Sequence, residues 1–264
     1  MGGTKLRLII AAVIALFALI SYFGTSSLNP ITGEKQRLSL TPEQEIAMGL
    51  QTAPQMAAQF GGLSDDARAK ALVKRIGNRL VAQSVATQSP YKYDFHLLDD
   101  SRTVNAFALP GGQVFITEGL LKLLRTEGEL AAVLGHEIGH VLARHSAEHL
   151  AKQALTQGLV GAVVVGSGDM SAGQIAQQVG AMINMKYGRD DELESDALGI
   201  RLVSEAGYDP RAMIGVMEVL ARASRGSGPP EMLSTHPNPE NRAGKIKAEI
   251  EKKFPNGIPS GLVR

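Results

Sequence analysis

One five-residue string constrains this chain more than any other feature: His136-Glu137-Ile138-Gly139-His140. In an α-helix, residues four apart share a face and lie about 6 Å apart along the axis, so both imidazoles can reach one metal ion. Glu137 is turned about 100° from His136, beside such a metal, where it can take a proton from a bound water. The string therefore predicts a zinc site with its own base. The alternative is two histidines that only form hydrogen bonds on a helix face.

The preceding residues predict the helix that this site needs. Thr126 and Glu129 have the spacing of a capping box, in which the threonine caps the first turn and the glutamate reaches back. Apolar residues then recur at helical spacing: Leu130, Ala131, Val133, Leu134, Ile138, Val141 and Leu142. We expect a half-buried helix with the metal site about two turns from its start.

A second histidine pair, His145 and His149, has the same spacing and is expected on the same helix. At 100° per residue, His145 lies about 180° round from His136, so this pair cannot join the first site. With Arg144 and Glu148 beside it, the pair is expected on a mainly solvated, salt-bridged face; the alternative is a contact with residues that support the metal ligands or with a lid.

A catalytic zinc needs a third protein ligand, and residues 189–203 offer the best source. Read as a helix, this segment has one face carrying Glu192 and Asp196 and then Gly199, Ile200 and Val203. Carboxylates on a core-facing side are costly unless they bind a cation or a donor. Glu192 is therefore the expected third ligand, and Asp196 is expected to accept the free N–H of a ligand histidine. The alternative is a helix N-terminus enriched in acids that suit its dipole.

Four motifs in this order make the chain resemble the gluzincin metallopeptidase family of HtpX and the CAAX prenyl proteases. Within that family the chain is most similar to the bacterial periplasmic branch typified by BepA and LoiP. The resemblance covers about residues 40–252 and implies that Glu192 is the third zinc ligand. The motifs are residues 136–140, the pair Glu192 and Asp196, the stretch from Val104 to Gly112, and Thr235-His236-Pro237 followed by Arg242.

The resemblance also implies roles for residues that the pattern alone leaves open. Family members use the strand Asn105-Ala106-Phe107-Ala108 as an exposed edge that takes an extended substrate by backbone hydrogen bonding. Without the resemblance this strand reads as part of an ordinary core hairpin. His236 is expected near the metal, where it either stabilises the oxyanion or acts as a removable fourth ligand. Arg242 is carried over as a supporting residue, and its alternative is an arginine in contact with solvent.

The implied reaction is hydrolysis of a peptide bond by a zinc-dependent endopeptidase. Zinc would activate the water, and Glu137 would accept its proton and pass it to the leaving amine. The competing class is a zinc-bound chaperone or adaptor whose proteolysis is weak or latent because His236 fills the position that water needs. A purely structural zinc is disfavoured, since structural sites are usually closed by four ligands rich in cysteine. The chain has no cysteine, which also excludes thiol catalysis.

Composition restricts the class of partner. The 264 residues are 44% apolar, enough for a full core without disulfides. A net charge of +1 and 5% aromatic residues, with no basic run, argue against nucleic acid as a partner. Protein or peptide substrates are expected instead, and the family suggests unfolded or misassembled envelope proteins.

The N-terminus predicts export. Lys5 and Arg7 precede an apolar run from residue 8 to residue 23, which predicts a signal peptide or an N-terminal membrane anchor over residues 1–25. Gly24-Thr25-Ser26 is the nearest match to a cleavage site. The positive flank stays in the cytoplasm, so the rest of the chain is expected in the bacterial periplasm, with residues 8–23 as the anchor if they are retained. No cysteine is present to acylate, which excludes a lipoprotein.

The expected organisation is a linker over residues 26–40, a metallopeptidase domain over residues 41–254 and a flexible tail over residues 255–264. The fold class is α+β and mostly helical, a zincin-like domain with a small antiparallel sheet whose edge strand faces the active-site helix. Residues 152–188 are interpreted either as a lid or plug over the cleft or as a buried helical hairpin. A helix is expected from about residue 172 to residue 187.

Overall fold

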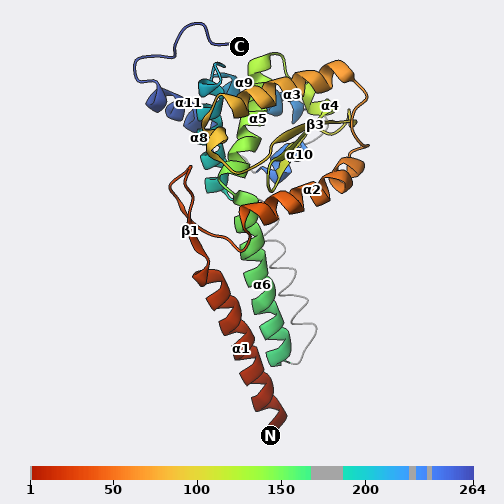
Figure 1. Cartoon of the computed structure of the whole chain (residues 1–264), viewed down its shortest axis with the longest axis vertical. Helices are drawn as coiled ribbons and strands as arrows, with labels where there is room; N and C mark the ends of the chain where they lie inside the picture. The colour runs from red at the N-terminus through yellow and green to blue at the C-terminus, as the bar shows by residue number, and fades with distance from the viewer. Residues whose placement is uncertain (1, 168–186, 226–229, 237–239) are drawn as a thin grey trace. The chain divides into compact units, whose positions relative to one another are not determined.

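The computed structural model describes residues 2–167, 187–225, 230–236 and 240–264 (Figure 1). The chain divides into two compact units. The helix-pair unit comprises residues 1–41 and 145–187, and the site unit comprises residues 42–144 and 188–264. The sequence placed residues 145–187 within the peptidase domain, whereas the structure groups them with the N-terminal residues. The helix expected over residues 172–187 lies almost entirely outside the described residues.

The site unit is mostly helical, and the predicted α+β class is confirmed. Its helices are α2 (Pro42–Gln59), α3 (Ala67–Ala82), α4 (Glu118–Leu121), α5 (Glu127–Leu142), α8 (Arg189–Glu205), α9 (Ala212–Ala223), α10 (Glu231–Thr235) and α11 (Arg242–Lys253). A 3₁₀ turn, η1, covers Val85–Gln88. The strands are β3 (Asp94–Leu98), β4 (Ala106–Leu109) and β5 (Gln113–Thr117).

These three strands form one sheet in the order β3-β5-β4. Strands β4 and β5 form the predicted antiparallel hairpin, but β3 runs parallel to β5, so the sheet is mixed and not antiparallel. The chain leaves β3 and crosses to the far edge before β4 begins, which puts β5 in the centre with all five residues buried. The hairpin turn uses Gly111 at φ +80°, where an added Cβ would lie 2.4 Å from the Cα atom of Ile46. Only glycine fits this turn.

Helix α5 forms the centre of the site unit. Every residue from Gly128 to Leu142 is buried, because α3, α8, α9 and β4 all pack around the helix. The expectation of a half-buried helix was therefore wrong, since its polar face is turned toward another helix and not toward water. Functional side chains on this helix consequently lie in a dry environment.

Helices α5 and α8 approach each other closely through glycines. A Cβ added at Gly139 would lie 2.9 Å from the backbone oxygen of Ser195, and one added at Gly199 would lie 3.2 Å from the backbone nitrogen of His136. On α5, Gly135 is one turn before Gly139 and meets a methyl group of Val203 in the same way, at 3.1 Å. The missing side chains allow the two backbones to come nearly into contact, which brings the carboxylates of α8 to the histidines of α5.

Helix α5 ends before the second histidine pair, so the prediction of one continuous helix was wrong. The chain turns at Arg144, which has φ +57°, and its guanidinium donates a 2.9 Å hydrogen bond from Nε to the buried carboxylate of Glu45. A new helix, α6 (His145–Ser167), follows. His145 is only 1% exposed, so it is not part of a solvated face.

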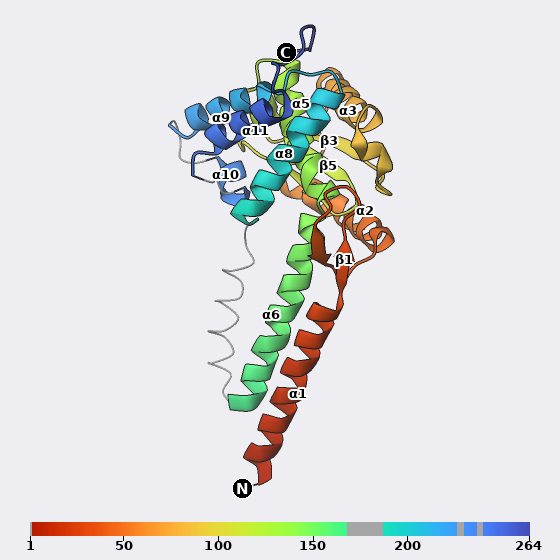
Figure 2. The same cartoon turned by 90° about the vertical axis from the view of Figure 1, so that its left-hand side faces the viewer.

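The helix-pair unit is built from α6 and the N-terminal helix α1 (Gly2–Gly24), which run side by side in both views (Figures 1 and 2). Between them in sequence, β1 (Ser26–Leu28) and β2 (Lys35–Arg37) form an antiparallel hairpin within the expected linker. By length and composition, Gly3–Gly24 is the one helix among the described residues that could cross a membrane.

We expect Gly139→Ala to destabilise the site unit. The added methyl group must displace the backbone of α8, and overpacking of this kind costs about 1–3 kcal/mol. Thermal denaturation of the full chain in detergent, followed by circular dichroism, should show a melting midpoint lowered by about 2–4 °C for each kcal/mol. Gly161→Ala is the control, since a Cβ there meets nothing within 4 Å. An unchanged midpoint for Gly139→Ala would mean that the helices are not held at this separation.

Candidate metal centre

The start of α5 fixes the position of its histidines. The Thr126 hydroxyl accepts a 3.1 Å hydrogen bond from the backbone N–H of Glu129, as the capping motif predicts. The Glu129 carboxylate does not return to Thr126 but accepts from the backbone N–H of Arg125 at 2.6 Å and from its guanidinium at 2.8 Å. These hydrogen bonds connect the first turn of α5 to Thr126 and Arg125, and His136 follows about two turns later.

The structure brings His136, His140 and Glu192 together. The Nε2 atoms of the two imidazoles are 3.0 Å apart. The Glu192 carboxylate reaches between them, with Oε2 3.5 Å from Nε2 of His136 and Oε1 3.4 Å from Nε2 of His140. All three side chains are at most 3% exposed. Two histidines of one helix and a glutamate more than fifty positions later thus present three potential ligand atoms to one point.

His236 adds a fourth potential ligand. It follows α10, where its backbone N–H donates to the carbonyl of Met232 at 2.8 Å, and it is 1% exposed. Its Nδ1 lies 2.9 Å from Oε1 of Glu192 and 3.4 Å from Nε2 of His136. One ligand atom from each of the four residues lies within 4.8 Å of the others.

These separations fit a tetrahedral metal ion. Zinc binds histidine nitrogen and carboxylate oxygen at about 2.0–2.2 Å, which puts neighbouring ligand atoms of a tetrahedron about 3.4 Å apart. The contacts among His136, His140 and Glu192 are 3.0, 3.5 and 3.4 Å. The donor set of imidazole and carboxylate, with no sulfur, is that of a catalytic rather than a structural zinc site. The cluster therefore fits a zinc-sized cation.

Asp196 and Arg242 contact two residues of the cluster, His136 and Glu192. Oδ1 of Asp196 lies 3.0 Å from Nδ1 of His136, the ring nitrogen that faces away from the cluster. Arg242 holds that carboxylate with two 2.7 Å hydrogen bonds, from Nε and from Nη2, and its Nη1 lies 3.0 Å from Oε2 of Glu192. Such contacts fix the ring orientation and the tautomer of a ligand histidine.

Burial and neighbouring donors shift the pKa values of Glu192 and Asp196 in opposite directions. Burial by itself would raise the pKa of Glu192, but hydrogen bonds from His136, His140 and His236 outweigh burial and lower that pKa. The pKa of Asp196 is also lowered, because Arg242 and His136 outweigh its burial. Both carboxylates are thus held in the charged form that binds cations.

The pKa of His136 is raised, whereas the pKa values of these two carboxyl groups are lowered. Burial disfavours the charged imidazole of His136, but its hydrogen bonds with Asp196 and Glu192 prevail and raise its pKa to about 9. The pocket therefore favours positive charge at the point where the imidazoles meet.

Glu137 differs from the other two acids. It is 1% exposed, and burial raises its pKa. Its Oε1 has no hydrogen-bond partner among the described residues, and the nearest imidazole nitrogen, Nε2 of His236, is 3.7 Å away. A buried carboxylate oxygen without a donor is costly, so its persistence suits a site that is completed by a water or a substrate.

The edge strand β4 has one side paired with β5 and no strand on its other side among the residues that the structure describes. Ala106 and Ala108 are buried, and Phe107 is half-buried and stacks on Phe115 with ring centroids 4.9 Å apart. Asn105 is buried just before the strand and donates a 3.3 Å hydrogen bond to Glu231 of α10. Helix α5 packs against β4, so this edge and the histidine helix are neighbours within the site unit.

Two features of the site were not anticipated from the sequence. Gly139 lies inside the histidine motif, yet its contact with α8 was not predicted; its spacing of four from Gly135 was an available signal for close helix packing. Glu231, the partner of Asn105, carries no such signal, because the two residues are 126 positions apart.

We expect Arg242→Met to destabilise the fold strongly, because it leaves two buried carboxylates without their cation. Removing one partner of a buried ion pair costs about 3–5 kcal/mol. Arg201→Met is the matched control, since Arg201 pairs with Glu205 on the exposed side of α8 and such a pair contributes about 0–1 kcal/mol. Urea denaturation of both variants measures the difference, and equal midpoints would contradict a structural role for the buried pair.

Comparison with known proteins places this site in a family. The model of peptidase family M48 matches residues 67–250. The beta-barrel assembly-enhancing protease of Yersinia pestis is 34% identical over 242 residues, covering 88% of this chain and 49% of the relative. Its counterpart in Escherichia coli strain K12 is 28% identical with the same coverage. The mitochondrial metalloendopeptidase OMA1 of Schizosaccharomyces pombe is 32% identical over 233 residues, covering 86% of this chain and 67% of the relative.

The chain spans about half the length of the beta-barrel assembly-enhancing proteases that it matches. The matched family and the relatives agree with the resemblance predicted from the four motifs, and the printed names of the relatives are those of proteases. The chain therefore belongs to peptidase family M48.

Proposed function

We propose that the chain is a zinc-dependent endopeptidase that hydrolyses peptide bonds of unfolded or misassembled envelope proteins, as part of protein quality control. One observation carries the proposal: four potential ligand atoms meet within 4.8 Å beside a buried glutamate oxygen that has no donor in the described part of the chain. A metal with a base beside it is the arrangement that hydrolysis of an amide requires.

In this proposal His136, His140 and Glu192 would hold one zinc ion per chain. Asp196 accepts the N–H of His136 and so keeps the opposite nitrogen directed at the metal. Arg242 fixes Asp196 by its two hydrogen bonds and neutralises part of the negative charge of Glu192. The three ligands leave a fourth position for water or substrate, as in other catalytic zinc sites.

The chain's own residues then move the proton. Bound zinc would supply a Lewis acid and a water of lowered pKa. Glu137 is placed to accept the proton of such a water and to deliver it to the leaving amine; burial raises the pKa of its carboxyl group, so the carboxylate binds a proton more readily than an exposed one does. His236, whose Nε2 faces Glu137 at 3.7 Å, is placed to donate to the developing oxyanion.

The substrate is proposed to bind as an extended strand along β4. The residues concerned are Asn105, Ala106, Phe107 and Ala108, at the edge of the sheet that lacks a paired strand among the described residues. Backbone hydrogen bonds at such an edge give affinity without demanding a particular sequence, which suits unfolded substrates. The hydrogen bond of Asn105 to Glu231 holds the start of this strand.

The compartment proposed is the bacterial periplasm, with residues 8–23 as a membrane anchor. The names of the relatives from Yersinia pestis and Escherichia coli refer to assembly of β-barrels, a process of the bacterial envelope. The apolar helix α1, with Lys5 and Arg7 in its first turns, agrees with export of the residues that follow.

A second candidate function is a zinc-bound chaperone or adaptor with latent proteolysis. The observation in its favour is His236, whose Nδ1 lies within 3.4 Å of both Glu192 and His136. An imidazole at this place can take the fourth metal position and exclude the water that hydrolysis needs.

Glu137→Gln tests the general base. We expect the variant to retain zinc, since Glu137 is not a ligand, and to lose cleavage of a disordered protein such as casein by about 100- to 10,000-fold. Glu127→Gln is the control, because this half-buried residue lies on the same helix and its carboxylate pairs with Arg75. Equal cleavage by the Glu137→Gln and native chains would disprove the assignment. Undiminished complementation of a deletion strain by the inactive variant would favour the chaperone.

His236→Ala separates the two candidate functions. If His236 stabilises the oxyanion, kcat should fall by about 100- to 1,000-fold while metal analysis still finds one zinc per chain. If His236 instead blocks the metal, cleavage of casein should rise. Loss of zinc from the variant would contradict both, because the other three ligands would then be insufficient.

A further inference from the structure

Helix α1 presents an apolar surface on most of its circumference. The large side chains that remain exposed on it are Leu6, Leu8, Ile9, Ile10, Val13, Leu16, Phe17, Leu19, Ile20 and Phe23. A contiguous apolar surface of this size marks an interaction site. The 22 residues of Gly3–Gly24 are about 33 Å long at 1.5 Å per residue, close to the roughly 30 Å hydrocarbon thickness of a bilayer.

Both ends of α1 carry the residues expected at membrane surfaces. Lys5 and Arg7 lie in its first turns, and the next charged residue in the sequence is Glu34. At the other end, the guanidinium of Arg37 on β2 lies 5.4 Å from the ring centroid of Tyr22 and 4.8 Å from that of Phe23. Tyrosine and arginine are favoured at the level of lipid head groups. The surface of the bilayer is therefore expected near Tyr22.

Helix α6 lies along α1 in the opposite direction and contacts it through small residues. A Cβ added at Gly158 would lie 2.6 Å from Cβ of Ala18, and one added at Gly166 would lie 3.2 Å from Cβ of Ala11. Ala162, halfway between the two glycines, is buried. Small residues at spacings of four allow close helix packing in membranes, where lipid supplies no hydrophobic force between helices.

The register between the two helices determines how deep α6 reaches. From Tyr22 to Ala11 the axis of α1 rises by about 16 Å, more than half of the hydrocarbon thickness. Gly166 of α6 lies at the level of Ala11. Residues 158–166 contain no polar or charged side chain, and Val163 is 46% exposed. This part of α6 thus has the composition that burial in lipid requires.

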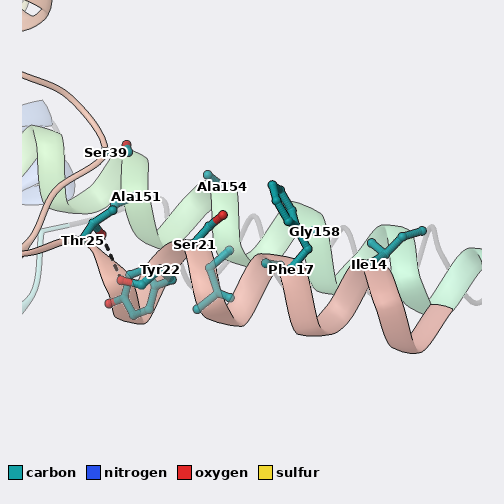
Figure 3. Close-up of a pocket in the computed structure, with 11 residues that line it drawn as sticks. Ile14, Phe17, Ser21, Tyr22, Thr25, Ser39, Ala151, Ala154 and Gly158 are labelled. Atoms are coloured by element: carbon teal, nitrogen blue, oxygen red, sulfur yellow. Dashed lines mark hydrogen bonds between the residues drawn. The ribbon is translucent and has the colours of Figure 1, made fainter. Parts of the chain in front are cut away.

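A groove between the two helices is also apolar. It has a volume of about 470 Å³ and is lined mainly by Ile14, Phe17, Ala18, Ala154, Leu155 and Gly158. Figure 3 shows Tyr22, Thr25 and Ser39 at one end of this groove and Ile14 at the other. Hydroxyl groups at the level of the head groups and hydrocarbon beyond them match the polarity profile of a phospholipid.

We propose that α6 enters the lipid bilayer beside α1, as a helix that packs on a retained anchor and presents its outer face to acyl chains. A helix satisfies its own backbone hydrogen bonds and can therefore enter lipid without spanning it. The run of eight apolar residues at 159–166 is too short to cross the membrane alone. Because α6 packs against α1, it can enter the lipid without crossing the membrane. Entry of α6 into lipid does not depend on peptidase activity.

Single cysteines test the proposal, because the chain has none of its own. Val163→Cys places a thiol on the outer face of α6, and Lys247→Cys places the control on the exposed side of α11, where the lysine side chain is 69% exposed. Membrane fragments open on both sides are treated with a membrane-impermeant maleimide before and after addition of detergent. We expect the thiol at 163 to react at least tenfold more slowly than the control until detergent is added, since a thiol in lipid does not ionise.

Two results would overturn the proposal. Equal labelling at 163 and 247 in intact membranes would place α6 in water. Protection at 163 that persists in detergent would mean that protein, such as a second copy of the chain, covers this face instead of lipid. Sequencing of the N-terminus gives a further test: mature protein that lacks residues 2–24 has no anchor for α6 to pack on, which would also overturn the proposal but leave the comparison of Glu137→Gln with the native chain untouched.

The contact between the helices has its own matched pair of variants. Ala11→Cys with Gly166→Cys should form a disulfide in membranes under mild oxidation, whereas Ala11→Cys with Gly161→Cys should not. Adding Gly158→Leu to the first pair should reduce the cross-link at least fivefold, because the new side chain meets Ala18; Gly161→Leu should not, since a Cβ there meets nothing within 4 Å. Absence of the first cross-link, or equal effects of both leucines, would contradict the packing.

Discussion

Burial of two carboxylates on α8 is the constraint on which the site depends. Glu192 and Asp196 are at most 3% exposed, and a buried carboxylate is costly unless cations or donors surround it. Three imidazoles contact Glu192, while Arg242 and His136 contact Asp196. Helix α8 is therefore contacted by the histidines of α5, by His236 in the loop after α10 and by Arg242 at the start of α11. The glycine contacts between α5 and α8 make that approach sterically possible.

Periodicity and motif spacing predicted much of this arrangement. The face of α8 that begins with two acids and continues as small and apolar residues is the buried face, and the capping threonine starts α5 where the sequence indicates. The family and the α+β class were predicted correctly from the motifs. The roles of His136, His140, Glu192 and the supporting residues stay predictions, although the structure brings these side chains together.

The failures of prediction have long-range causes. The break between α5 and α6 has no glycine or proline at the turn; it occurs at Arg144, which is held by Glu45, 99 residues earlier in the chain. The parallel pairing of β3 with β5 depends on where the chain crosses the sheet, and alternation of side chains does not encode this. The burial of α5 on all sides reflects how many neighbours it has, which its own sequence does not specify. Local patterns identified the elements, whereas contacts distant in sequence decided how they end and pair.

The turn at Arg144 has a mechanical consequence. A non-glycine residue in the left-handed region carries strain of about 1–3 kcal/mol, which is offset by the ion pair with Glu45 on α2. Tyr91 donates a further 3.0 Å hydrogen bond to the same carboxylate. Arg144 is the last residue of the site unit before the chain continues into α6. A force transmitted along the chain from α6 therefore reaches Arg144, which Glu45 holds to α2, before it reaches His140, four residues upstream.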